Sequence, residues 1–179
     1  MRREVCEFRW LHIRYEEVRD LLRDRLVALL RPAATAGSRR GDETLSTLAA
    51  DLGGLHLERD IAVEVGRYEE LGPPFPIVRY PVRWHDAAHP GLYPIMEGVL
   101  EAYPITGNRT QISVQGGYRP PLGPVGAAVD VLVLHRVADS AVEHFLEAFT
   151  QRVEAAWHDG RRDPPTPPRA LSEPERTGG

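Results

Sequence analysis

Histidine and aspartate side chains gather in the segment WHDAAHPG, which holds His85, Asp86 and His89. A His-x-x-x-His pair binds zinc when both imidazoles lie on one face of a helix. Here a strand-like pattern precedes the segment and Pro90 follows it at once, so a helix is not expected. The segment also lacks the Glu that such motifs carry after the first His. We therefore interpret it as a solvated loop and expect no metal site.

Asp130 is the one acidic residue in the apolar run GAAVDVLVL, which has a helical pattern. Burial there would raise the pKa of its carboxyl group and suit it to act as a general base. The alternative, which we favour, places Asp130 in water beside Arg136 or Arg59. Cys6 has no evident partner, so a nucleophilic role for its thiol is not favoured.

Arg79 and Arg83 lie close to Tyr80 in one predicted strand. Basic residues interleaved with aromatic ones can bind single-stranded nucleic acid. Strand alternation, however, sends the arginines to the face opposite the tyrosine. The formal net charge of the chain is -4, whereas nucleic-acid binders usually carry a basic excess. We expect no nucleic-acid partner.

The length and composition are those of one globular domain, because 179 residues suffice to bury a core. The single cysteine cannot form an internal disulfide, and no signal-peptide pattern or run of about 20 apolar residues occurs. Neither a nucleotide-binding glycine pattern nor the Gly-x-Ser-x-Gly elbow of hydrolases is present. We expect a cytoplasmic, soluble protein with no membrane segment and no cofactor.

The elements that must position these residues follow from the apolar spacing. Apolar residues at helical spacing predict an amphipathic helix over 16–30, and the small and polar segment AATAGSRRGDE predicts an exposed loop from 33. A short helix is predicted over 43–52. From 56 to 118 the period changes to two, which predicts several antiparallel strands with one wet face.

Turns and breaks refine this order. Turns are predicted at Gly72-Pro73-Pro74 and at Thr106-Gly107-Asn108. Pro81 removes a ladder hydrogen bond, so its strand is predicted to lie at an edge or to be bulged there. A last helix is predicted over 124–157 with a bend or break near 138–140. The Pro-rich polar segment 159–179 is predicted to be a disordered tail.

The segment YRPPLGPVGAAVD places Pro120, Pro121 and Gly123 between the last predicted strand and the last predicted helix. Prolines end a strand ladder, and Pro124 suits the first turn of a helix that lies across the sheet. The predicted order of elements is a strand, helices, a sheet and a final long helix. Together with this segment, that order resembles the SRPBCC or START-like superfamily over about residues 4–158. The positions that carry the resemblance are Tyr118, Pro120, Pro121, Leu122, Gly123, Gly126, Asp130, Phe145 and Leu146.

The resemblance implies an α+β helix-grip domain over 1–158, in which a curved antiparallel β-sheet wraps around a long C-terminal α-helix. The chain departs from the family pattern in two places. Arg14 to Arg19 stands where an Ala-Pro segment and a Val-Trp pair are usual, and the segment 33–42 is longer and more basic than expected. The resemblance implies that both departures lie on the entrance side of a cavity.

One set of apolar and aromatic residues occupies the alternate strand positions whose side chains are predicted to point to the inner face of the sheet. The resemblance implies that this set lines a cavity between sheet and last helix, whereas alternation alone is more typical of a filled core. The set consists of Tyr80, Trp84, Met96, Leu100, Ile112, Val114 and Tyr118, with Leu132 from the helix.

Three functions remain open from the sequence. The first is the binding of a hydrophobic or amphipathic small molecule, such as a lipid, a polyketide-like compound or an isoprenoid. The second, which the resemblance implies, is a polyketide cyclase/dehydrase-type enzyme that uses the same cavity. The third is an interaction domain with a filled core. The inward set offers few polar groups, which favours binding over catalysis, and no catalytic residue is assigned.

Overall fold

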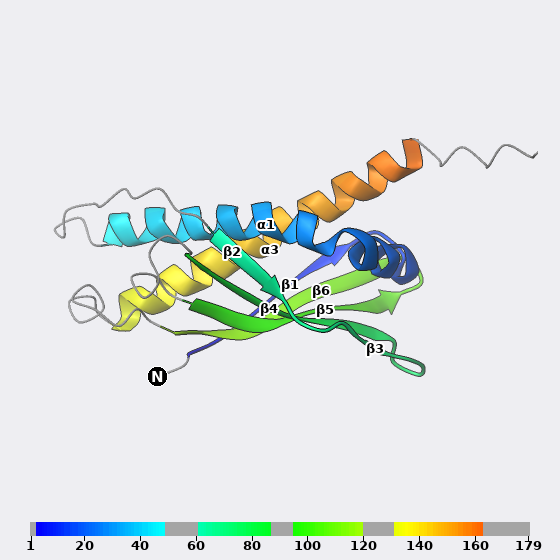
Figure 1. The fold of residues 1–179 in the computed structure, drawn as a ribbon, viewed down its shortest axis with the longest axis horizontal. Coiled ribbons are helices and arrows are strands. Elements are labelled where there is room, and N and C mark those ends of the chain that lie inside the picture. Colours follow the sequence, from blue (N-terminus) through cyan, green and yellow to red (C-terminus); the bar gives the residue numbers. More distant parts are fainter. Residues whose placement is uncertain (1–2, 49–60, 87–94, 120–130, 163–179) are drawn as a thin grey trace, which may run out of the picture.

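The computed structural model describes residues 3–48, 61–86, 95–119 and 131–162 (Figure 1). Several sequence predictions lie outside these residues: His89, the segment Pro120 to Pro124, Asp130 and the part of the predicted 159–179 tail from 163 on; residues 159–162 of that tail belong to the last helix. The elements are β1 (Arg3–Leu11), α1 (Tyr15–Leu48), β2 (Ile61–Val65), β3 (Glu69–Leu71), β4 (Ile77–Asp86), β5 (Ile95–Thr106), β6 (Arg109–Arg119) and α3 (Val131–Arg162).

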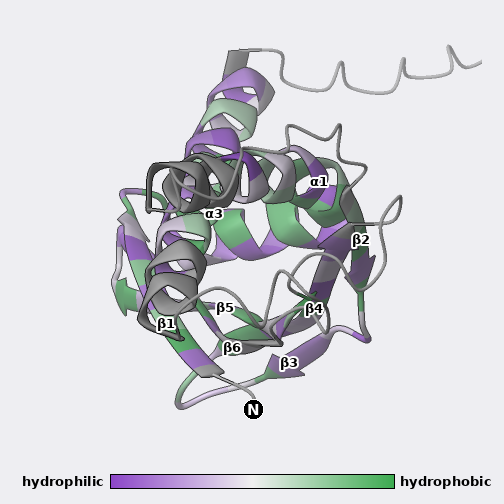
Figure 2. Ribbon diagram, turned by 90° about the vertical axis from the view of Figure 1, so that its left-hand side faces the viewer, coloured by the Kyte–Doolittle hydropathy of each residue, from purple (hydrophilic) through white to green (hydrophobic). Residues whose placement is uncertain are grey.

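The strands form one antiparallel sheet in the order β1-β6-β5-β4-β2, and β3 pairs with β4 beside β2. The sheet curves into a trough, and the two helices close its open side (Figure 2). α3 lies nearest to β1 and α1 nearest to β2. The predicted α+β class, with a curved antiparallel sheet and a C-terminal helix on its inner face, is confirmed. The cover is a pair of helices rather than one.

Alternation of side chains sets the core, as the period-two pattern predicted. On β4, Val78, Tyr80, Val82 and Trp84 are buried, while the residues between them face outward or are half-buried. The turn around Gly72-Pro73-Pro74 joins β3 to β4, and Gly107-Asn108 joins β5 to β6, so both predicted turns are confirmed.

The predicted loop from residue 33 is wrong, because α1 continues through it to Leu48. Ala33 and Ala34 are fully buried, and Gly37 packs directly against α3. A Cβ atom at Gly37 would lie 2.5 Å from the carbonyl oxygen of Ala141 and 2.7 Å from Cβ of Phe145. The small residues that resembled a loop are therefore the surface on which the two helices meet.

Pro81 does not lie on an edge strand, so that part of its prediction is wrong. β4 pairs with β5 on one side and with β2 and β3 on the other. The irregularity is in the neighbouring strand, where the chain leaves the ladder over 66–68, and the carbonyl oxygen of Pro81 accepts a hydrogen bond from the Gly66 amide at 2.7 Å. The nitrogen of Pro81, which cannot donate a hydrogen bond, therefore faces the gap between β2 and β3.

α3 is one helix from Val131 to Arg162, so of the predicted bend or break near 138–140 the break is absent. The helix also continues past the predicted end at Trp157. It runs antiparallel to α1, since Arg161 lies 3.3 Å from Glu17 while Ala141 and Phe145 lie against Gly37.

Replacing Gly37 by alanine tests the helix contact. Alanine normally stabilises a helix interior by about 1 kcal/mol relative to glycine. At Gly37 the added methyl group meets backbone of α3, so we expect the Gly37→Ala variant to lose about 1–3 kcal/mol of unfolding free energy. Urea denaturation followed by circular dichroism measures the change.

Gly160 is the matched control, because it also lies in a helix and nothing lies within 4 Å of its Cβ position. The Gly160→Ala variant is expected to keep or gain stability. Equal effects of the two substitutions would show that the helices do not meet at Gly37.

Candidate functional site

Polar side chains gather at one end of the core, where α1 begins and where the chain passes from β2 to β3. Tyr15 is the first residue of α1, Tyr68 lies between β2 and β3, and Tyr80 lies on the inner face of β4. The start of α1 is held in place by Thr110 of β6, whose buried hydroxyl donates to the carbonyl oxygen of Ile13 at 2.8 Å. This bond fixes the turn that delivers Tyr15 into the core.

Tyr15 and Tyr80 each bury a hydroxyl group that has no hydrogen-bond partner among the described residues. Both residues are 4% exposed. An unsatisfied buried hydroxyl costs about 1–3 kcal/mol, and most buried polar atoms in proteins are paired. An acceptor from outside the described residues would satisfy both hydroxyl groups.

Tyr68 and Glu70 form the outer part of this cluster. The Tyr68 ring lies 5.2 Å from the Tyr80 ring between centroids, and its hydroxyl donates to the Glu70 carboxylate. Arg19, one helical turn after Tyr15, lies 3.6 Å from the Glu70 carboxylate and 2.9 Å from that of Asp20. These ion-paired side chains lie between α1 and β3, and they form a charged rim next to the buried phenols of Tyr15 and Tyr80.

Burial also controls the ionisation of these phenols. Desolvation raises the pKa of Tyr80 well above its usual value, and the nearby Tyr68 adds to the effect. Desolvation followed by the charge of Glu70 raises the pKa of Tyr15, and desolvation with the Glu70 hydrogen bond raises that of Tyr68. All three phenols therefore stay neutral at ordinary pH, so the unpartnered hydroxyls are available as hydrogen-bond donors and not as bases.

The far end of the core is filled by aromatic rings. Trp84 stacks on Phe145 of α3 with 4.6 Å between ring centroids, and Phe145 stacks on Phe149 at 6.0 Å. All three side chains are buried. The interior beside Trp84 is thus occupied by protein.

The structure brings most of the sequence-predicted site residues to one surface, the inner face of the sheet. Met96, Leu100, Ile112 and Val114 are buried there with Tyr80 and Trp84. Of Tyr118 in β6 and Leu132 in α3, only the backbone placement is described. That these residues line a ligand pocket stays a prediction.

Sequence reasoning missed Tyr15, Arg19, Tyr68 and Glu70. Tyr15 and Arg19 are four residues apart, and this spacing places them on one side of a helix. That side meets β3 through the Arg19–Glu70 ion pair, a contact between distant parts of the chain that no local pattern shows. β3 is short and polar, so its sequence shows no alternation of apolar and polar residues that would predict a strand.

The other candidate residues have separate places. Arg79 and Arg83 lie on the outer face of β4 and pair with carboxylates, Arg79 with Glu101 at 2.6 Å and Arg83 with Glu64 at 3.3 Å. This confirms that they point away from Tyr80. Cys6 is exposed on β1. Within the described residues no group of three or more His, Cys, Asp or Glu side chains is placed to hold a metal ion.

Two open hollows on the surface are lined by other residues. One lies along the exposed side of α1 from Arg23 to Pro32. The other, about 450 Å³, lies over β2, β4 and β5 and includes Gly66, Pro81 and Gly98. Neither contains a residue of the predicted pocket.

Comparison with known proteins gives likenesses to solved structures only; no family model and no curated protein matches the chain. A conserved protein of Geobacillus kaustophilus is 15% identical, with 86% of this chain and 97% of that chain covered, at a TM-score of 0.48. The Zhui aromatase/cyclase of Streptomyces sp. R1128 is 15% identical, with 86% and 94% covered, at a TM-score of 0.40. Likenesses at these scores carry no conclusion about function. No helix in the described part of the chain is long and apolar enough to cross a membrane.

The raised tyrosine pKa values predict how stability depends on pH. A tyrosine whose folded pKa exceeds its unfolded value, about 10, stabilises the fold fully below that pH and loses this contribution as pH rises toward the folded value. We therefore expect the unfolding free energy to fall above pH 10, and to fall less steeply in a Tyr80→Phe variant. Denaturant titrations across the alkaline range measure the slope, and an unchanged slope in the variant would contradict the burial of the Tyr80 phenol.

Proposed function

We propose that the protein binds an amphipathic small molecule whose polar end accepts hydrogen bonds from Tyr15 and Tyr80. The observation that carries the proposal is the pair of buried hydroxyl groups without partners, among the described residues, at one end of the core. Binding would satisfy both groups and recover the free energy that their burial costs.

A third unpartnered donor supports the same end of the core. The indole N–H of Trp157 is buried without a partner among the described residues. Arg161 lies over the Trp157 ring at 4.8 Å and reaches Glu17 at 3.3 Å, which places this indole beside the start of α1. Three donors without an acceptor in the described part of the chain favour a ligand that brings oxygen acceptors, such as a carbonyl, hydroxyl or carboxylate group.

The apolar part of the ligand would lie along the inner face of the sheet, where binding would have to open the packing between sheet and helices. Tyr80 is in register with Leu100 of β5, and Leu100 is in register with Val114 of β6. Both aliphatic side chains are almost fully buried on the inner face. A ligand whose polar end meets the tyrosines would therefore lie against this row, toward the stacked rings of Trp84 and Phe145.

Binding is favoured over catalysis. The buried polar residues of the described part are Thr110, Ser113 and Thr150, and none of them can act as a general base at neutral pH. The phenols remain protonated for the reasons given above. A cyclase or dehydrase step would need a carboxylate base such as Glu70, which is already paired with Tyr68 and Arg19 at the rim, or Asp130, which lies outside the described residues.

Replacing Tyr80 by phenylalanine separates binding from stability. Removing a hydroxyl that has no protein partner should leave the unfolding free energy at pH 7 unchanged or raise it by up to about 1 kcal/mol. Ligand affinity should fall about tenfold, because one hydrogen bond to the ligand is lost. Quenching of tryptophan fluorescence by decanoic acid, farnesol and a hydroxyanthraquinone gives the affinities, and chemical denaturation gives the stability.

Tyr103→Phe is the matched control. Its hydroxyl accepts a hydrogen bond from Gln111 on the outer face of the sheet, so this variant should bind the same probes like the parent protein. If none of the three probes binds, and native mass spectrometry of protein from its host shows no retained molecule, the proposed function is wrong and the filled-core hypothesis remains.

A further inference from the structure

β1 is the edge strand of the sheet, and it pairs only with β6 among the described strands. Its outer face carries large apolar side chains in the open. Phe8 is 47% exposed and Trp10 is 53% exposed, and their rings lie 5.8 Å apart. Long edge strands with exposed apolar residues pair readily with another strand unless something prevents it.

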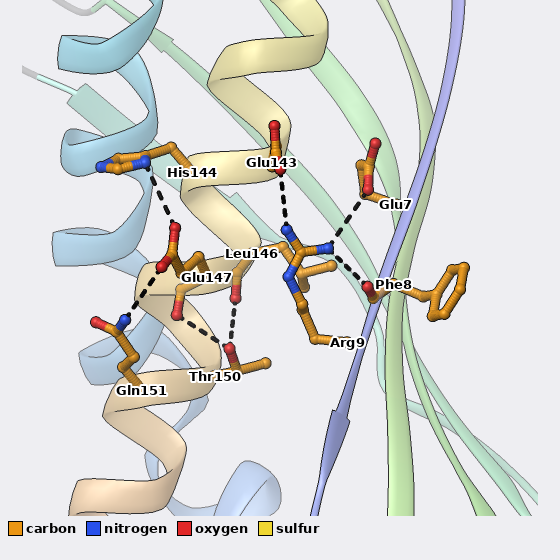
Figure 3. Close-up of polar contacts among 9 residues, drawn as sticks. All are labelled: Glu7, Phe8, Arg9, Glu143, His144, Leu146, Glu147, Thr150 and Gln151. Carbon is orange, nitrogen blue, oxygen red and sulfur yellow. Dashed lines mark hydrogen bonds and ion pairs between the residues drawn. The ribbon is translucent and has the colours of Figure 1, made fainter.

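The inner face of the same strand carries charges at its centre. Glu7 and Arg9 alternate with the aromatic residues, and Arg9 reaches Glu143 of α3 at 3.3 Å and Glu7 at 3.6 Å (Figure 3). Arg9 also donates to the carbonyl oxygen of Phe8 at 2.9 Å. Figure 3 shows the Phe8 ring on the side of the strand away from α3. A partner strand must therefore match one positive and one negative charge spaced two residues apart.

A second copy of β1 matches these charges in one register. In an antiparallel pair that continues the sheet, opposite residues share a face, so a two-fold axis must place one residue opposite the same residue of the second copy. An axis at Phe8 places Glu7 opposite Arg9 of the partner, twice by symmetry. An axis at Glu7 or at Arg9 places like charges opposite each other, which is destabilising.

We propose that the protein forms a two-fold symmetric dimer in which β1 pairs antiparallel with β1 of a second copy, centred on Phe8. The two sheets then become one continuous sheet, and the free backbone groups of both edges are satisfied. On the outer face the Phe8 rings of the two copies become neighbours, and each Trp10 lies opposite Cys6 of the other copy. The ion pairs of Arg9 within one copy are exposed and therefore weak. Replacing them by ion pairs with the second copy costs little free energy.

Charge reversal tests the register. Arg9→Glu places two glutamates opposite each other at both symmetric positions, and Glu7→Arg places two arginines there. We expect each single variant to weaken dimerisation by about tenfold or more, and the double variant Glu7→Arg/Arg9→Glu to restore it. Analytical ultracentrifugation over a dilution series measures the equilibrium, and circular dichroism checks that each variant is folded.

A cysteine at the centre of the interface gives a second readout that needs no charge change. Directly opposite residues have Cα atoms about 4.5–5.5 Å apart, which is within disulfide range. We expect the Cys6→Ser/Phe8→Cys variant to form a disulfide-linked dimer on mild oxidation. Native Cys6 lies opposite Trp10 in this register, so the unmodified protein is the control and should not cross-link.

Three outcomes would overturn the dimer. They are sedimentation of the protein as a monomer at every concentration, failure of the Cys6→Ser/Phe8→Cys variant to cross-link, and a double charge variant that dimerises as weakly as the single ones. The last result, with a dimer still present in the parent protein, would place the interface elsewhere. None of these outcomes bears on ligand binding at Tyr80, which lies on β4.

Discussion

The approach of α1 to α3 at Gly37 is the contact on which the rest of the structure depends. With no side chain at this position, the backbone of α3 at Ala141 and the Cβ of Phe145 come against α1. The two helices can then act as one cover for the trough of the sheet, with α3 toward β1 and α1 toward β2 (Figure 2). A larger residue at 37 would force the helices apart and change the space between cover and sheet.

This arrangement gives the core two different ends. Near the helix contact, Phe145 stacks on Trp84 and fills the interior with rings. At the other end the start of α1 brings Tyr15 into the core at the same end as Tyr80, and neither hydroxyl is satisfied by the described protein. Packing stabilises the first end, while the second accepts a cost in free energy that a ligand would offset. The charges of Arg19 and Glu70 lie at the rim of that second end.

The sheet was predictable from the sequence, because alternation reports directly which side of a strand is buried. Tyr80, Trp84, Leu100 and Val114 were assigned to the inner face on that basis and are buried there. The length of α1 was not predictable, because small residues and Gly37 resemble a loop when no partner helix is considered. The cluster of tyrosines was missed for a related reason. Its members come from α1, β4 and the β2–β3 junction, and only the helix pair and the break opposite Pro81 bring them together.

A crystal structure of the protein purified with its natural ligand, or soaked with the tightest of the probe molecules, tests the central claim most directly. The account predicts density for a molecule at the start of α1, with an oxygen within hydrogen-bond distance, about 2.5–3.0 Å, of the Tyr80 or Tyr15 hydroxyl. It is contradicted if both hydroxyls are paired with protein atoms in that structure and the space beside them holds only side chains.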